Sequence, residues 1–469
     1  MNKLLFTVLL VLPLLSFAQD CDCQSDFQWM KKTFEENDAG FRYVLTQKGD
    51  EFYQQHNEAF LKKVKETTTK IECYQVMRDW KTFFRKGHFE IRPLNLENSQ
   101  ANTSHDNWET LNISLEKFKE QLINKKNTDY EGIWKSGPYT IGIKKIKDEY
   151  KGFIIEADGR QWKIEEVKLI INADNSTTYY MGDYSSENFK KAEMLGDKYL
   201  QLGYITLERV FPKSKSNATI ERYYKAISAE TPYLEKINDN TLLLRIPSFD
   251  SSQKKDIDSV LLANQNLITN TKNLIIDLRD NGGGSDKSFE KILPILYTNP
   301  IETVGVELFS TPSNNQRVKN FISHPQASKE LKDWARKAYE KLSNNLGNYV
   351  NLDSTRVSIT KFDTIQQFPK KIGIITNGQN ASTTEQFLLA ARQSTKVKLF
   401  GQTTFGALDI SYTYPAESPC GDFELWYCLS KSLRIPEMTI DGKGVHPDYY
   451  IYNNIPKYKW IDFVVQNLN

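Results

Sequence analysis

The carboxy-terminal half of the sequence alternates continuous apolar segments with amphipathic ones, and this alternation constrains the fold more than any other feature. The segments NLIIDL (273–278) and KKIGIIT (370–376) are apolar at consecutive positions, and each is followed by a Gly- or Asn-containing turn and a helical pattern. Strands of this kind are buried on both faces, as happens when helices cover both sides of a parallel sheet. We therefore predict an α/β core with a largely parallel sheet and flanking helices over residues 231–469.

Two regions of different character precede this core. Residues 19–128 have mainly helical patterns, and the clearest helix is expected at about 71–86, where apolar side chains recur at three- and four-residue steps. Residues 129–230 contain short alternating runs separated by Gly, Asp and Asn, which predicts a small β-rich domain. Its place in the chain would suit a peptide-binding, PDZ-like module. Within the core, residues 313–351 have the composition of a helical insertion.

The first 18 residues are typical of a cleavable secretory signal, with one Lys before an apolar run and small residues before Gln19. We therefore expect export to the periplasm or the exterior. The run is shorter than the roughly 20 residues of a bilayer span and no second run follows, so no membrane span is expected after cleavage. With 61 basic and 59 acidic residues, the chain has no excess charge that would attract nucleic acid.

Five cysteines in an exported chain predict disulfide bonds. Cys420 and Cys428 flank a short segment and could close a hairpin, while Cys73 could pair with Cys21 or Cys23. A zinc site needs four well-spaced ligands, and no His stands beside these cysteines. We expect neither a metal ion nor another cofactor.

Two strand-to-helix turns carry residues that suit catalysis. Gly282–Gly284 follow the first strand, and consecutive glycines let backbone N–H groups approach a ligand at the carboxyl end of a sheet strand. Ser382 follows the second strand at a helix start, where free N–H groups can stabilise an oxyanion. Each feature also has a purely structural explanation. The glycines could serve only as a connection, and Ser382 could form a capping box with Glu385.

Together, the segments DLRDNGGG, NASTTEQ, GQTTFG and GKGVHPD resemble, in this order, the catalytic core of the tail-specific (carboxy-terminal processing) serine protease family. The resemblance covers about residues 235–455 and implies an α/β peptidase core that hydrolyses peptide or protein substrates. Ser382 matches the family's nucleophile. Gly282 and Gly283, with the N–H of Thr383, match its oxyanion hole.

The sequence departs from the family pattern at the position of the catalytic base. Serine/lysine members carry a Lys directly after the threonine-phenylalanine-glycine segment, and this chain has Ala407 there. Lys396 and Lys398 belong to a predicted strand and Lys443 to a predicted loop, so none of them matches the motif. Ser382 therefore needs a different base.

The related tricorn core proteases use a histidine from the helical domain and an acid three residues before the last motif. His88 and Asp441 occupy the corresponding positions here, so the resemblance implies a triad with Ser382. Gly87 stands where the tricorn enzymes have a serine. Of the five histidines, His88 alone is predicted at a structured helix-to-strand corner, and His446 is the reserve candidate; the others are His56, His105 and His324.

Two other functions are consistent with the sequence. Loss of the family lysine is what a catalytically inactive peptidase fold would show, and such a protein would bind peptides or a cell-envelope partner. Alternatively, the β-rich domain could recognise sugar, lipid or peptide, with Trp134 and Trp162 lining the site, although aromatic side chains in small β domains more often form the core.

Overall fold

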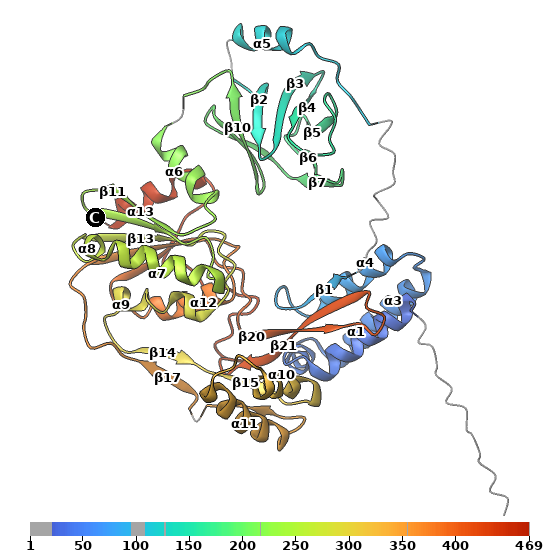
Figure 1. Cartoon of the computed structure of the whole chain (residues 1–469), viewed down its shortest axis with the longest axis vertical. Helices are drawn as coiled ribbons and strands as arrows, with labels where there is room; N and C mark the ends of the chain where they lie inside the picture. Colours follow the sequence, from blue (N-terminus) through green and yellow to red (C-terminus); the bar gives the residue numbers. More distant parts are fainter. Residues whose placement is uncertain (1–20, 95–107, 126–127, 216, 354, 469) are drawn as a thin grey trace, which may run out of the picture. The chain divides into compact units, whose positions relative to one another are not determined.

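The computed structural model describes residues 21–94, 108–125, 128–215, 217–353 and 355–468 (Figure 1). The predicted signal at 1–18 and His105 lie outside these residues. The chain divides into two compact units, each assembled from separate segments. The first unit comprises Met1–Glu97, Glu302–Ser358 and Ala407–Gly442, and the second comprises Asn98–Ile301, Ile359–Gly406 and Lys443–Asn469. The domain boundaries predicted from the sequence stay a prediction.

The first unit packs amino-terminal helices against a five-stranded sheet with the order β1-β21-β15-β16, in which β20 also pairs with β21. Figure 1 shows the blue helix α1 beside strand β21. Its elements are α1 (Cys23–Asn37), α2 (Phe41–Lys48), α3 (Asp50–Glu66), α4 (Lys70–Trp80), η1 (Lys81–Phe83), β1 (Glu90–Pro93), β15 (Val306–Phe309), α10 (Pro312–Ser323), α11 (Lys329–Ser343), β16 (Tyr349–Val350), β20 (Ile410–Glu417) and β21 (Phe423–Ser432).

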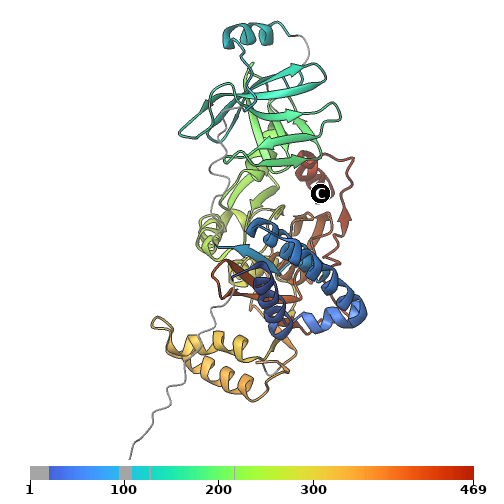
Figure 2. The same ribbon diagram turned by 90° about the vertical axis from the view of Figure 1, so that its right-hand side faces the viewer.

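Aromatic side chains from both ends of the chain form the core of this unit. Phe34 and Trp80 are fully buried and pack with Phe423 from β21. The predicted helix at 71–86 is confirmed in part, since α4 ends at Trp80 and a 3-10 turn follows. This tighter turn places Phe84 in the aromatic core, and the predicted strand after it is β1. The predicted helical insertion corresponds to α10 and α11, which lie side by side in Figure 2.

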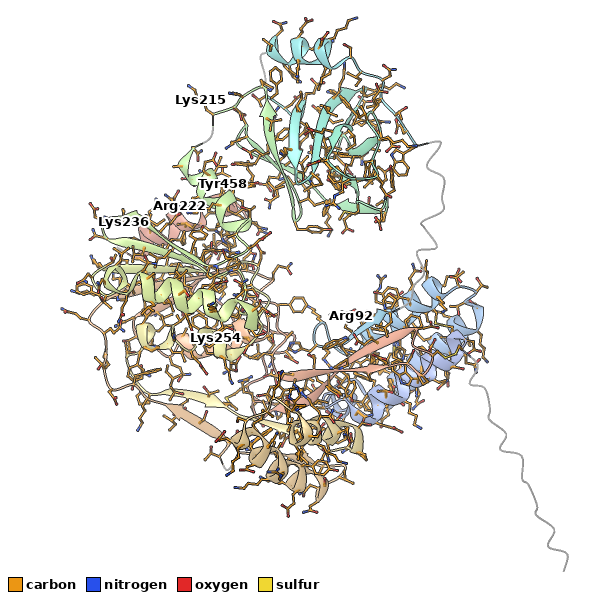
Figure 3. The ribbon with its side chains drawn as sticks, viewed as in Figure 1. Arg92, Lys215, Arg222, Lys236, Lys254 and Tyr458 are labelled. Carbon is orange, nitrogen blue, oxygen red and sulfur yellow. A yellow bond between two sulfur atoms is a disulfide. The ribbon has the colours of Figure 1, made fainter. Side chains whose placement is uncertain are left out.

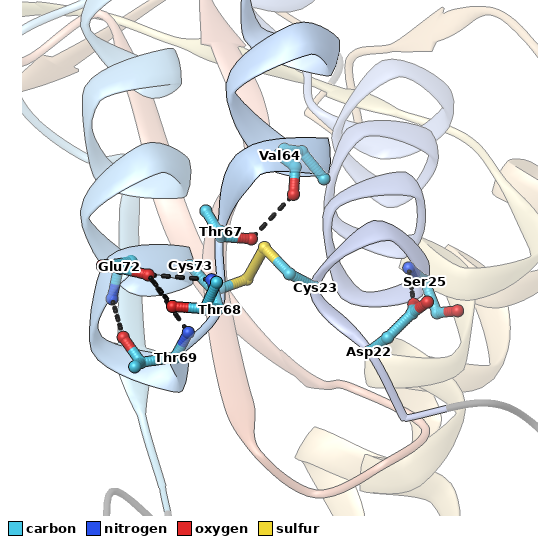
Figure 4. The surroundings of a disulfide bond; sticks show 9 residues. All are labelled: Asp22, Cys23, Ser25, Val64, Thr67, Thr68, Thr69, Glu72 and Cys73. Carbon is cyan, nitrogen blue, oxygen red and sulfur yellow. Dashed lines mark hydrogen bonds between the residues drawn. A yellow bond between two sulfur atoms is a disulfide. The ribbon is translucent and has the colours of Figure 1, made fainter.

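Two disulfides link the amino-terminal residues of this unit to later parts of the same unit. Cys23 bonds Cys73 beside the capping box of α4, in which Thr69 and Glu72 exchange hydrogen bonds (Figure 4). Cys21 bonds Cys420, and Cys428 is a buried free thiol.

The predicted Cys420–Cys428 bond is therefore wrong. The extended residues from Phe423 to Cys428 in β21 span about 16 Å, at about 3.3 Å per residue. Cα atoms joined by a disulfide lie about 4.4–6.8 Å apart. The strand therefore carries Cys428 away from the turn that holds Cys420.

The second unit contains a mixed six-stranded sheet with the order β11-β12-β13-β18-β19-β22, in which β11 is antiparallel and the other neighbours pair in parallel. Its helix α13 covers one face through Trp460 and Val464. The elements of this part are β11 (Tyr233–Asn238), β12 (Thr241–Arg245), η2 (Ser251–Gln253), α7 (Lys254–Ala263), α8 (Gln265–Ile268), β13 (Asn273–Asp277), η3 (Asp286–Phe289), α9 (Leu293–Leu296), β18 (Lys371–Thr376), α12 (Thr383–Ala391), β19 (Val397–Gly401), β22 (Tyr449–Tyr450), η4 (Lys457–Lys459) and α13 (Trp460–Leu468). Strands β14 (Ile301–Val304) and β17 (Val357–Thr360) form a separate pair.

The remainder of the second unit is a nine-stranded antiparallel sheet with the order β7-β6-β5-β4-β3-β2-β10-β9-β8. Trp134 and Trp162 are buried in its core, so they do not form an exposed binding surface. Arg222 lies on the helix that follows this sheet and is labelled in Figure 3. Its guanidinium forms ion pairs with the Glu235 carboxylate at 3.2 Å and with the Asp462 carboxylate at 3.5 Å. The elements are α5 (Leu115–Ile123), β2 (Gly132–Ser136), β3 (Tyr139–Ile146), β4 (Glu149–Ala157), β5 (Val167–Ile171), β6 (Thr177–Tyr180), β7 (Ser186–Phe189), β8 (Ala192–Leu195), β9 (Tyr199–Leu202), β10 (Ile205–Phe211) and α6 (Ala218–Ile227). Among the described residues, no helix is both long and apolar enough to cross a bilayer.

Candidate active site

Ser382 occupies a strained turn between β18 and α12. Its backbone has φ 55° and ψ −125°, a region that residues with a side chain rarely adopt. Its N–H donates to the Glu385 carboxylate at 3.3 Å, and the residue is partly exposed. A sharp strand-to-helix turn of this kind presents a serine hydroxyl at the end of a sheet, as in the nucleophile elbow of α/β hydrolases.

The glycine loop after β13 packs directly against Ser382. A Cβ at Gly283 would lie 2.7 Å from the carbonyl oxygen of Ala381 and 2.9 Å from both the Ser382 Cβ and the Thr383 nitrogen. Gly283 also has φ +107°, which favours glycine. Only a residue without a side chain therefore lets the two turns approach this closely.

Hydrogen bonds join the glycine loop to the start of α12. The Asn281 side-chain oxygen accepts from the Gly283 N–H at 3.0 Å and from the Thr384 hydroxyl at 2.8 Å. The Thr383 hydroxyl donates to the Gly284 carbonyl at 2.9 Å. These bonds hold the backbone of both turns in one arrangement.

Two backbone N–H groups near Ser382 can donate hydrogen bonds to a ligand. The Gly283 N–H is already engaged by Asn281, whereas no acceptor for the Gly282 or Thr383 N–H occurs within the described residues. Gly282 is exposed, and a Cβ there would meet nothing within 4 Å. The geometry therefore favours Gly282 over Gly283 as the partner of Thr383 in binding a negatively charged oxygen.

The last two sequence motifs meet the serine turn through Glu385. Its buried carboxylate accepts from the Thr404 hydroxyl at 2.5 Å and from the Gly406 N–H at 2.8 Å. Thr404 in turn accepts from the Val445 N–H at 2.7 Å. From the sequence, Glu385 was recognisable only as a capping residue three positions after Ser382. The structure shows that it also anchors the threonine-phenylalanine-glycine segment.

Lys396, Lys398 and Lys443 make no hydrogen bond to Ser382 within the described residues. The Lys396 ammonium donates to the Gln366 carbonyl, and burial lowers the pKa of this lysine. Lys398 and Lys443 are exposed. The base must therefore be sought elsewhere.

His88 lies in the first unit with its imidazole in a defined protonation state. Its Nδ1 lies 2.7 Å from the carbonyl oxygen of Ile410. Because a carbonyl oxygen can only accept, Nδ1 carries the proton and Nε2 has the free electron pair. Burial lowers the pKa of His88, which favours the neutral ring at pH 7. The ring is therefore prepared to accept a proton at Nε2.

Asp441 holds the backbone that orients His88. Its carboxylate accepts from the N–H groups of Leu408, Asp409 and Ile410 at 2.6, 2.7 and 3.2 Å. Burial and the charge of Asp409 raise the pKa of Asp441, while its own charge opposes the burial effect on the pKa of His88. Asp441 thus acts on the imidazole through the Ile410 carbonyl and through its charge.

A second set of contacts fixes the His88 backbone, which has φ 55°. Arg85 donates to the His88 carbonyl at 2.8 Å and forms a two-pronged ion pair with Asp38 at 2.7 and 2.6 Å. The Cys428 thiol also donates to the His88 carbonyl, at 3.1 Å. Sequence reasoning missed Arg85, Asp38 and Cys428, because nothing in their spacing connects them with the histidine.

The structure thus assembles the expected site residues as two groups. Ser382, Thr383, Gly282 and Gly283 belong to the second unit, and His88 and Asp441 belong to the first. The other described histidines have separate contacts. His446 is exposed with its Nδ1 3.0 Å from the Thr403 hydroxyl, and His56 contacts the Trp80 carbonyl, while His324 is exposed. Within the described residues, no cluster of three or more His, Cys, Asp or Glu side chains could hold a metal ion.

Comparisons with known proteins identify the family of this region. Residues 240–451 match the model of peptidase family S41. Mature CPAF aligns at TM-score 0.52 with 13% identity, over 95% of this chain and 96% of that one. CPAF complexed with lactacystin aligns at TM-score 0.50 with 13% identity, over 95% of this chain and 98% of that one.

The tricorn protease aligns at TM-score 0.42 with 12% identity, over 95% of this chain but 36% of that one. A search of curated protein sequences finds no match. The CPAF likeness shows a shared fold. Residues 240–451 therefore belong to peptidase family S41, the family of the tail-specific proteases whose motifs they resemble.

Proposed function

We propose that the protein is an active serine peptidase in which Ser382 is the nucleophile and Nε2 of His88 is the general base. The observation that carries the proposal is the strained backbone of Ser382, packed against a glycine loop that leaves N–H groups of Gly282 and Thr383 available. Strain in a turn held by so many hydrogen bonds is a mark of functional sites.

The reaction is acyl transfer to the serine followed by hydrolysis. Ser382 Oγ attacks the peptide carbonyl carbon while His88 Nε2 takes its proton, and the N–H groups of Gly282 and Thr383 bind the resulting oxyanion. The imidazolium then gives the proton to the leaving amine as the C–N bond breaks. A water molecule, deprotonated by the same nitrogen, hydrolyses the acyl-enzyme. The step requires Nε2 to come within about 2.6–3.2 Å of the hydroxyl.

Asp441 acts on His88 indirectly in this triad. It positions Ile410, whose carbonyl accepts a hydrogen bond from Nδ1–H of His88 and so keeps Nε2 unprotonated. Its charge also stabilises the imidazolium formed after the serine loses its proton. A histidine base in place of the family lysine makes the enzyme tricorn-like.

We further propose that the protein acts outside the cytoplasm, after removal of residues 1–18. Two disulfides in the first unit support this location, because such bonds persist in oxidising compartments. The proposed substrates are peptide or protein chains, and the proposed chemistry needs no cofactor.

Labelling with a serine-reactive fluorophosphonate tests the proposal directly. The intact chain should label, Ser382→Ala should not, and His88→Gln should label at least about 100-fold more slowly because the base is lost. His446→Gln, which removes the exposed histidine of the last motif, serves as the matched control and should label normally. A folded protein that does not label would instead be the inactive peptide binder, and equal losses in both histidine variants would contradict the role of His88.

A further inference from the structure

An apolar cavity of about 340 Å³ lies in the first unit, between the insertion helices and the sheet. Its lining includes Val318 and Phe321 of α10, Trp334 of α11, Leu352, and Tyr412 of β20. Its volume is at the lower end of the range of about 300–1,000 Å³ that is usual for ligand pockets.

The charged side chains of Arg317 and Asp353 also line the cavity, whereas the two buried amides of the lining are already hydrogen-bonded within the protein. The Asn314 amide donates to the carbonyls of Asn37 and Phe309 at 2.8 and 2.9 Å, and its oxygen accepts from the Tyr427 hydroxyl at 3.2 Å. The Asn315 amide donates to the Ser310 hydroxyl at 3.0 Å. These groups are poorly suited to bind a polar ligand, whereas an apolar group would lose no hydrogen bond by entering the cavity.

The cavity lies close to the part of strand β20 that orients His88. The Ile410 carbonyl accepts a hydrogen bond from the His88 ring. Tyr412, two residues further along the strand, lines the cavity. Two residues of extended strand span about 7 Å, which is also the span of two residues of an extended peptide.

Tyr412 combines a large exposed side chain with an unusual backbone. Its φ of 58° is uncommon for a bulky residue in a strand, and its side chain is 55% exposed. Local backbone strain persists only where the surrounding structure imposes it, and it is concentrated at functional sites. The strained tyrosine stands at a cavity next to the residue that holds the catalytic base.

We infer that this cavity is a specificity pocket, which receives a large apolar side chain of the peptide substrate within a few residues of the bond that is cleaved. The inference rests on the proposed function of His88, because the carbonyl that orients its ring and the cavity wall share one strand. Tyr412 is a specificity-determining residue in this arrangement. Phe, Leu or Met in the substrate fits the apolar part of the lining, whereas Gly or Ala would bury little apolar surface there.

Peptide binding to the full chain carrying Ser382→Ala tests the pocket without requiring catalysis. Two ten-residue fluorescent peptides, which differ only by Phe or Ala at one central position, are compared by anisotropy. The Phe peptide should bind at least tenfold more tightly. Leu352→Trp, which fills the partly buried wall of the cavity, should reduce this ratio to below threefold. Leu346→Trp is the matched control, since Leu346 is 53% exposed and is not part of the lining.

The outcomes separate the pocket from the proposed activity. Equal affinities for the two peptides, no measurable binding of the Phe peptide, or the same loss of preference with Leu346→Trp would each overturn the pocket. Absence of fluorophosphonate labelling with a retained Phe preference would overturn the catalytic proposal and support the pocket as a peptide-binding site.

Discussion

The strain at Ser382 gives a quantitative prediction that combines activity with stability. Ser382→Gly and Ser382→Ala both remove the hydroxyl, so both should abolish fluorophosphonate labelling. Only glycine adopts φ 55° without a steric penalty, whereas alanine retains the Cβ that causes the strain. The two variants should therefore differ in the free energy of unfolding.

The size of this difference follows from the backbone geometry. Relief of the strain contributes about 1–3 kcal/mol, and the greater freedom of glycine in the unfolded chain costs about 0.4–1 kcal/mol. Ser382→Gly should thus be more stable than Ser382→Ala by about 1 kcal/mol. The second unit is larger than a domain of about 150–250 residues, in which about 1 kcal/mol corresponds to about 2–4 °C, so the Tm should be higher by about 2 °C.

Urea unfolding and thermal denaturation of both variants measure the difference. Ser328 provides a matched control, because it also caps a helix but has an ordinary φ of −63°. Glycine and alanine differ at any capping position, so the glycine-minus-alanine difference at 382 must exceed the one at 328. Equal differences at the two positions would refute the argument that the turn stores strain.

Three further predictions concern the glycine loop, Asp441 and a buried lysine of the nine-stranded sheet. Gly283→Ala should destabilise the second unit and abolish labelling, because the new Cβ would lie 2.7 Å from the Ala381 carbonyl oxygen. Gly282→Ala is the control and should keep the fold, because a Cβ there meets nothing within 4 Å. Equal unfolding curves for the two variants would contradict this prediction. Asp441→Asn removes a charge that raises the pKa of His88, so the acidic limb of the labelling pH profile should move to lower pH. An unmoved limb would exclude this charge effect. Burial lowers the pKa of Lys168 from 10.5 to about 7 in the folded protein. Between these two pH values the unfolded chain binds one proton more than the folded chain, so the free energy of unfolding should rise with pH over this range. Lys168→Met should remove that slope and stabilise the protein near pH 7 by at most about 5 kcal/mol, as urea unfolding at several pH values can show.

Local patterns in the sequence predicted the elements on both sides of Ser382. Strands β13 and β18 and the helix after Ser382 occur where apolar runs and a capping residue predict them. The predicted helix boundaries were less accurate where tertiary packing determines the start of a helix. The helix expected from about 286 is a 3-10 turn at Asp286–Phe289 followed by the short α9, because the glycine loop turns onto Phe249 before a helix can begin.

What the sequence by itself determined is the chemistry that adjacent residues can create: three glycines that let two turns approach, a serine at a helix start, and an alanine where the family has lysine. These features depend on backbone conformations and side-chain spacings within a few residues. Only the tertiary structure decided the pairing of Cys21 with Cys420 and the hydrogen bond between His88 and Ile410, whose partners are separated by 399 and 322 positions. Packing brings such partners together, and no local pattern records which carbonyl will face an imidazole or which N–H will stay free.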